Sequence, residues 1–186
     1  MKCRIEISAR HIHLTKEDCL TLFGKDSLEI VKKLSQEEEF AAKESVKLVG
    51  PKNFLSGVRV VGPFRQQSQA EISFTDARFL DIKAPLKVSG DLPGAEIEVI
   101  GPKGSIKKEI AIVAKRHLHL STKEAIELKL NHRDNVKVKI LGERALIFDQ
   151  VVVRVRDDYN LSVQLDTDEA NAAGLFSESE GELILD

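Results

Sequence analysis

Alternating apolar and polar residues predict that most of this chain is β-strand. In residues 2–8, Cys3, Ile5 and Ile7 fall on one side of an extended segment, because successive side chains of a strand point to opposite faces. Similar short segments recur along the chain, separated by Gly-Pro-Lys turns. The further predicted strands are 46–49, 58–61, 96–100, 110–114, 136–140, 145–148, 151–155 and 161–165.

Short helices are predicted between these strands. Two of them begin at a hydroxyl residue followed three positions later by an acid, Thr15 with Asp18 and Ser121 with Glu124. The predicted helices are 16–23 (closed by Gly24), 75–80, 122–130 and a helix around 168–173. The remaining segments are predicted as a polar surface connection with a helical turn (25–45), a linker (89–94) and a last edge strand (183–185).

An internal repeat divides the chain into two similar parts. Residues 8–15, SARHIHLT, resemble residues 114–121, AKRHLHLS, and residues 57–61 match residues 150–154. At that second offset Glu71 lies over Gln164, and Ala77 lies over Ala170. Many short strands, few helices and a duplicated unit predict a mainly β fold of two small antiparallel β-barrels, capped by short α-helices. The predicted halves are residues 1–88 and 89–186.

Composition narrows the functional classes. The 186 residues carry a net charge of −2, 42% hydrophobic residues, 5% aromatic residues and no Trp. This balance argues against nucleic acid as a partner, and no apolar run is long enough to span a membrane. Cys3 and Cys19 are too few for a disulfide framework. We therefore expect a soluble cytoplasmic protein.

Four of the five histidines lie in the repeated motifs, as His11 with His13 and His117 with His119. Residues two apart on a strand point to the same side, so the two rings of a pair can bind one metal ion. A single pair is equally consistent with packed or exposed side chains, but its repetition favours metal sites. His132 lies in a turn and is predicted to be only exposed.

Catalytic zinc takes three protein ligands, so each pair needs a third. Glu71 is the candidate for the first pair, and its alternative is a solvated strand residue. Its counterpart Gln164 is neutral and a poor zinc ligand, so a second site with His117 and His119 would be weaker or completed by water.

Three arginines adjoin these residues: Arg10, Arg65 and Arg116. A guanidinium group offers a planar fork for phosphate or carboxylate oxygens, so an anionic substrate is predicted, although single arginines on strands are usually surface residues. The chain contains no G-x-x-x-x-G-K-[ST], G-x-G-x-x-G, G-x-S-x-G or C-x-x-C motif. Nucleotide-loop and serine-nucleophile chemistry therefore have no support.

Over residues 5–175 the chain resembles the PduL-type phosphate acyltransferases, also called phosphate propanoyltransferases. The motifs that carry the resemblance are SARHIHL (8–14), LVGPK (48–52), Arg65 with EIS (71–73), SGDLPG (89–94), IVAKRHLHLS (112–121) and DTDEANAAGL (166–175). The resemblance implies a reversible reaction of acyl-CoA with inorganic phosphate, giving acyl phosphate and coenzyme A. It also implies propanoyl or acetyl groups as the transferred acyl group, a homodimer and a link to propanediol utilisation.

The resemblance also implies two barrels that exchange strands, with residues 1–9 completing the C-terminal barrel, and a two-zinc site between the barrels. His11, His13 and Glu71 would hold one zinc, which meets the coenzyme A sulfur. His117 and His119 would hold the second, and Arg65 would bind phosphate. In this family a third histidine usually stands where this chain has Gln164.

Two expectations follow from departures from the family pattern. Because the chain starts at its first strand, without the helix that targets relatives to bacterial microcompartments, we expect a cytoplasmic enzyme, or one packaged into microcompartments by other means. Two alternatives stand beside the acyltransferase. One is a zinc-dependent thioester hydrolase that would use the same ligands on a water molecule, and the other is a degenerate, non-catalytic relative, which is suggested by Gln164 in place of a histidine.

Overall fold

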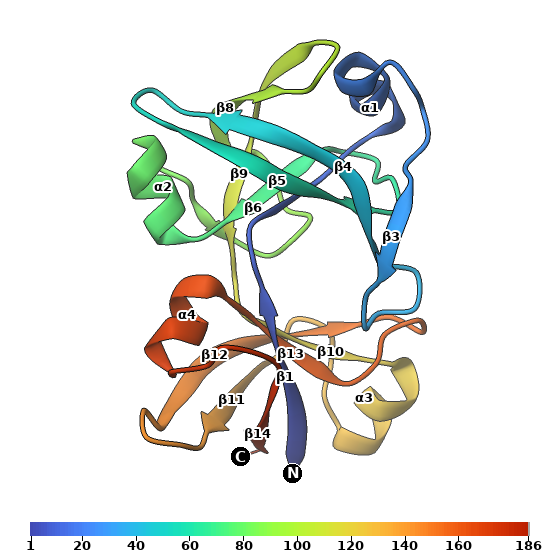
Figure 1. Ribbon diagram of the computed structural model, residues 1–186. Helices are drawn as coiled ribbons and strands as arrows, with labels where there is room; N and C mark the ends of the chain where they lie inside the picture. Colours follow the sequence, from blue (N-terminus) through green and yellow to red (C-terminus); the bar gives the residue numbers. More distant parts are fainter. Residues whose placement is uncertain (186) are drawn as a thin grey trace. The chain divides into compact units, whose positions relative to one another are not determined.

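A computed structural model describes residues 1–185 and divides the chain into two compact units (Figure 1). Unit 1 contains Met1–Ala9 and the chain from Lys115 onward, and unit 2 contains Arg10–Ala114. Each unit is a β-barrel with short helices, which confirms the predicted mainly β fold class. The pairings in both barrels are mixed, with parallel as well as antiparallel neighbours.

In unit 2, six strands close into a barrel in the order β4-β5-β2-β6-β9-β8, and β8 pairs back to β4. The short strands β3 and β7 add to β4 and β9. Buried side chains such as Ile12, Val60 and Ala70 fill the core. The strands are β2 (His11–His13), β3 (Ile30–Lys33), β4 (Phe40–Val49), β5 (Phe54–Gly62), β6 (Gln69–Ile72), β7 (Leu86–Lys87), β8 (Ala95–Ile100) and β9 (Ser105–Ala114).

In unit 1, the strand order β1-β13-β10-β12-β11-β14 closes because β14 pairs with β1. The N-terminal strand β1 therefore lies between β13 and β14, which confirms the strand exchange (Figure 1). Ile5, Leu118 and Val163 are fully buried in this core. The strands are β1 (Lys2–Ser8), β10 (His117–Leu120), β11 (Asn135–Ile140), β12 (Leu146–Val155), β13 (Ser162–Asp166) and β14 (Ser179–Ile184).

Four short helices follow equivalent strands in the two units. A helix follows each histidine strand, α1 (Lys16–Phe23) after β2 and α3 (Thr122–Leu128) after β10. The other two are α2 (Phe74–Leu80) after β6 and α4 (Thr167–Ala172) after β13. Side chains of Thr15, Ser73, Ser121 and Asp166 cap the four N-termini, as the sequence signals for α1 and α3 predict. No helix among residues 1–185 is long and apolar enough to cross a membrane.

The prediction for residues 25–45 was wrong, because this segment contains β3 and the first half of β4. All four residues of β3 are exposed and it pairs only with β4. An edge strand of this kind has no buried face, so its sequence shows no apolar alternation.

Two further strand boundaries differ from the prediction. Segments 145–148 and 151–155 form one strand, β12, in which Gln150 has a φ of 53°. Because its backbone is left-handed, Gln150 interrupts the alternation of buried and exposed side chains in β12. Gly57, with a φ of 68°, does the same in β5. The C-terminal strand β14 is longer than 183–185 and is not an edge, since it pairs with both β1 and β11.

Candidate metal centre

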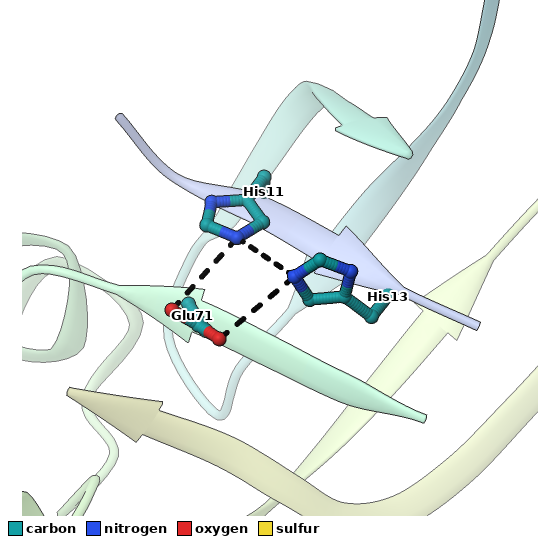
Figure 2. Close-up of side chains that lie close together, drawn as sticks. All are labelled: His11, His13 and Glu71. Carbon is teal, nitrogen blue, oxygen red and sulfur yellow. Dashed lines mark hydrogen bonds and ion pairs between the residues drawn. The ribbon is translucent and has the colours of Figure 1, made fainter. Parts of the chain in front are cut away.

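Strand β2 places His11 and His13 on one face of unit 2. The alternate residues Ile12 and Leu14 are buried in the core, so the two imidazoles point to the opposite side of the strand. The neighbouring strand β6 is antiparallel to β2 and pairs Glu71 with His11. Figure 2 shows the three side chains turned toward one another across the two strands.

The distances among these side chains suit a metal ion. His11 Nε2 lies 3.1 Å from His13 Nε2, and the two nitrogens lie 3.8 and 3.9 Å from the Glu71 oxygens (Figure 2). Ligands about 2.1 Å from a tetrahedral zinc ion are separated from one another by about 3.4 Å. The three groups therefore match a zinc site after shifts of a few tenths of an ångström. We call His11, His13 and Glu71 the first histidine site.

The protonation states also suit a metal. Burial lowers the pKa of His13 well below its usual value, and the positive charges of Arg65 and His11 lower it further. His13 Nδ1 lies 3.0 Å from the Val61 carbonyl oxygen, so a neutral ring donates there and leaves the Nε2 lone pair for a ligand bond. Burial alone would raise the pKa of Glu71, but His11, His13 and Arg65 outweigh it and lower that pKa to about 2. Two imidazoles and one carboxylate form a donor set that zinc commonly takes.

Arg65 and Ser89 surround the Glu71 carboxylate. The Ser89 hydroxyl donates a hydrogen bond to Glu71 Oε1 and accepts one of 3.2 Å from Arg65 Nη1. Arg65 Nη1 lies 3.7 Å from the same Glu71 oxygen, and Arg65 Nη2 lies 3.9 Å from Glu39 Oε1. A guanidinium group is thus placed beside the first histidine site, with its side chain 26% exposed.

Gln69, two residues before Glu71, fixes the backbone that carries Ser89. Its Oε1 accepts from the Gly90 amide at 2.7 Å, and its Nε2 donates to the Asp91 carbonyl at 3.0 Å. The segment 89–94, predicted as a linker, lies inside unit 2 and contacts the site. Sequence reasoning missed Ser89, Gln69 and Glu39 as site residues, although the SGDLPG motif offered a signal for the first.

The second histidine pair, His117 and His119, lies on β10 of unit 1. The ring centroids are 4.6 Å apart, and His119 stacks on Tyr159 at 4.0 Å. His117 pairs across the sheet with Gln164, whose amide Nε2 donates to Glu6 Oε2. Among residues 1–185, only the first histidine site brings three His, Cys, Asp or Glu ligand atoms within 4.8 Å of one another.

Arg10 and Arg116 make equivalent contacts in the two units. Arg10 contacts both carboxylate oxygens of Asp76, at 2.9 and 2.7 Å, and Asp76 belongs to the capping box of α2. Arg116 Nη1 contacts Glu169 at 2.7 Å, in the capping box of α4. Each arginine thus ties a histidine strand to the helix beside it. Their predicted contact with an anionic substrate stays a prediction.

The sequence profile of phosphate propanoyltransferases matches residues 4–176. The chain belongs to the phosphate propanoyltransferase family. A phosphate propanoyltransferase of Thermotoga maritima is 49% identical over 175 residues, which cover 92% of this chain and 83% of that protein. One of Escherichia fergusonii is 48% identical over 171 residues, covering 90% and 81%. One of Limosilactobacillus reuteri is 44% identical over 186 residues, covering 97% and 87%.

The structure shows where the site residues predicted from the sequence lie in this member of the phosphate propanoyltransferase family. The structure brings together His11, His13 and Glu71, and places Arg65 beside them. Gln164 pairs with His117 across the sheet, and its side-chain amide donates a hydrogen bond to Glu6. His132 is exposed, as predicted, and its Nδ1 accepts a hydrogen bond from the Val155 amide.

Proposed function

We propose that the protein is a zinc-dependent phosphate acyltransferase that interconverts propanoyl- or acetyl-CoA plus phosphate with acyl phosphate plus coenzyme A. The observation that carries this proposal is the first histidine site, a donor set of two imidazoles and a carboxylate, of which His13 and Glu71 are buried, with a guanidinium group 3.7 Å away. Membership of the phosphate propanoyltransferase family supports the reaction class.

A zinc ion held by His11, His13 and Glu71 would supply a Lewis acid for the thioester carbonyl and a binding position for the coenzyme A sulfur. The ligand residues themselves are prepared for this role by their surroundings. Glu71 is ionised over the whole neutral range because its pKa is about 2, so it holds a full negative charge toward the metal. His13 is oriented through its Nδ1 contact with the Val61 carbonyl.

Arg65 is proposed to bind inorganic phosphate. In the reaction a phosphate oxygen forms a bond to the acyl carbon, the carbon–sulfur bond breaks, and its electron pair leaves on the coenzyme A thiolate. Arg65 would hold the phosphate through charge-assisted hydrogen bonds and so fix the direction of attack. Its guanidinium group donates to the Ser89 hydroxyl at 3.2 Å and lies 3.7 and 3.9 Å from Glu71 and Glu39, and these contacts hold it beside the first histidine site, where phosphate would bind.

The chemistry needs no enzyme nucleophile. Both cysteines are buried, and burial raises the pKa of Cys3 to about 11 and raises that of Cys19. Neither thiol is therefore a thiolate near neutral pH, so direct attack by phosphate on the thioester agrees with the residues present.

His11→Ala and Glu71→Ala test the proposal. Each should remove the zinc of the first histidine site and lower acyl phosphate formation by at least about 100-fold, because a Lewis acid is worth several kcal/mol. Zinc is counted by mass spectrometry, and acyl phosphate is measured with propanoyl-CoA and acetyl-CoA. His132→Ala is the matched control, since His132 is exposed and lies in unit 1. Full activity in a His11→Ala protein without zinc at the first histidine site would exclude the mechanism.

Arg65→Ala tests the phosphate contact in the same assay. We expect the KM for phosphate to rise at least about tenfold while zinc remains bound, because a charge-assisted hydrogen bond contributes about 1.5–3 kcal/mol. An unchanged KM for phosphate contradicts the role of Arg65. Release of coenzyme A without any phosphate requirement would select the thioester hydrolase instead. Light scattering tests the homodimer that we also propose.

A further inference from the structure

A second carboxylate lies beside the arginine that is proposed to bind phosphate. Glu39 Oε1 is 3.9 Å from Arg65 Nη2, while Glu71 Oε1 is 3.7 Å from Arg65 Nη1. Glu71 belongs to the first histidine site, which accounts for its charge, but Glu39 is not one of the three residues of that site. A carboxylate beside an anion site repels the ligand, so its presence there needs a separate explanation.

Glu39 is held in place by its backbone. The Leu34 amide donates to the Glu39 carbonyl at 2.9 Å, and the Glu39 amide donates to the Gln36 carbonyl at 3.0 Å. Gln36 is buried, with 1% of its surface exposed. These contacts form a tight turn between β3 and β4, so the Glu39 carboxylate extends from an ordered segment.

Strand pairing brings this turn close to Arg65. Phe40, the residue after Glu39, pairs with Gly62 at the end of β5, and Arg65 follows three positions later. The pairing is close, because a Cβ atom at Gly62 would collide with the Phe40 ring. The Arg65 amide donates to the carbonyl of Leu14, directly after β2, at 2.9 Å. The side chains of Arg65 and Glu39 remain 26% and 23% exposed, so an anion from solvent can reach both.

Phosphate and sulfate differ in what they offer to such a carboxylate. Near neutral pH phosphate keeps a proton on at least one oxygen, so it can donate a hydrogen bond, whereas sulfate is fully ionised and can only accept. The doubly charged forms of the two anions are equally repelled by a negative charge. An ionised carboxylate only accepts hydrogen bonds, so it gains a bond from phosphate and meets sulfate without one.

We propose that Glu39 accepts a hydrogen bond from the protonated oxygen of phosphate bound at Arg65, and that this bond makes the site select phosphate over sulfate. Arg65 donates to the ionised oxygens, and Glu39 recognises the protonated one. A site built in this way rejects an analogue that lacks the proton, because the acceptor is then left unpaired. The inference rests on the proposed function, in which Arg65 binds inorganic phosphate, and adds the residue that sets the choice of anion.

Isothermal titration calorimetry of the full chain with phosphate, arsenate and sulfate at pH 7.5 tests this inference. Wild type should bind phosphate at least about tenfold more tightly than sulfate, the effect expected of one charge-assisted hydrogen bond. Arsenate is larger than phosphate but is also protonated at this pH. It should therefore bind like phosphate, which separates the effect of the proton from that of size.

Glu39→Gln is the decisive variant. An amide can accept from phosphate through its oxygen or donate to sulfate through its nitrogen. Sulfate should therefore bind at least about tenfold more tightly than in wild type, and the preference for phosphate should fall below about threefold. Glu37→Gln is the matched control, because it removes the same charge two residues away from an exposed position. It should keep the preference of wild type.

A purely structural role of Glu39 gives a different result. If Glu39 only held Arg65 in place, Glu39→Gln would weaken both anions by the same factor, and this unchanged ratio would overturn the inference. A wild type that binds no phosphate, or does not prefer it to sulfate, overturns it as well, as does an equal effect of Glu37→Gln. Acyl phosphate formation by such a protein would leave the proposed function standing. A wild type without phosphate-dependent release of coenzyme A would instead contradict the proposed function.

Discussion

Ser89 connects the anionic and cationic groups of the first histidine site. Its hydroxyl donates to Glu71 and accepts from Arg65, so one side chain sets the position of both. Metal ligands that are carboxylates are themselves hydrogen-bonded in most metalloproteins, and such partners tune the affinity for the metal. In the proposed zinc enzyme, Ser89 is therefore a positioning residue that would act on the metal through Glu71.

Ser89→Ala should weaken zinc binding at the first histidine site about 10- to 100-fold, the usual effect of removing a partner of a metal ligand. The dissociation constant is measured by competition with a chelator. Ser68→Ala is the control, because Ser68 is also buried and donates a hydrogen bond, but to Asp18. Equal zinc affinities for wild type and Ser89→Ala would show that Ser89 does not position Glu71.

Helices and strands with a local sequence pattern, such as a capping residue or alternating apolar positions, were predictable. Strands that are held only by pairing with another strand were not. Capping residues identified α1 and α3, and alternation identified β1. Strand β3 escaped prediction because pairing with β4, rather than a buried face, holds it in place. The candidate site followed the same rule. The repeat and the family resemblance indicated Glu71, whereas Glu39 became visible only through its ion pair with Arg65.

Helix α4 begins at the N-cap residue Asp166, whose carboxyl group has a raised pKa. Burial raises the pKa of Asp166 from its usual value of 3.8 to about 6, and the nearby carboxylates of Glu169 and Asp168 add to the effect. Between about pH 4 and pH 6 the unfolded chain loses this proton while the folded chain retains it, so stability falls as the pH rises. Above pH 6 the destabilisation is constant, and below pH 4 it is absent.

Asp166→Asn should therefore stabilise the protein at neutral pH. The amide oxygen can still accept from the Glu169 backbone N–H, now bonded at 2.8 Å, while the buried charge is gone. The gain should be about 1–2 kcal/mol above pH 6, after allowing for solvent screening, and should vanish near pH 4.

Thermal unfolding from pH 4 to pH 8 measures this gain. Asp166→Ala separates the effect of the cap from that of the charge. It removes both, whereas Asp166→Asn removes only the charge, so Asp166→Ala should be about 1 kcal/mol less stable than Asp166→Asn at every pH. A gain that does not change with pH would contradict the titration of Asp166.

On the scale of the whole molecule, the strand exchange makes unit 1 discontinuous in sequence and unit 2 continuous. Along the sequence, all of unit 2 lies between β1 and the rest of unit 1. Every pairing of the unit 2 barrel is made within residues 10–114, whereas the unit 1 barrel needs β1 between β13 and β14. We therefore expect residues 10–114 alone to fold and to bind about one zinc, since they contain the complete first histidine site.

Residues 115–185 alone should not fold. Without β1, strands β13 and β14 lose their shared partner, and the core loses Ile5, whose burial contributes about 1.5–3 kcal/mol. A permuted chain should restore the barrel, because Met1 and Leu183 exchange backbone hydrogen bonds of 3.1 and 2.7 Å, so a short glycine-containing turn can join residue 185 to residue 1. Circular dichroism melts and amide hydrogen exchange should show cooperative unfolding for 115–185 joined to 1–9 and none for 115–185. If both melt at the same temperature, β1 is not required for the fold of unit 1.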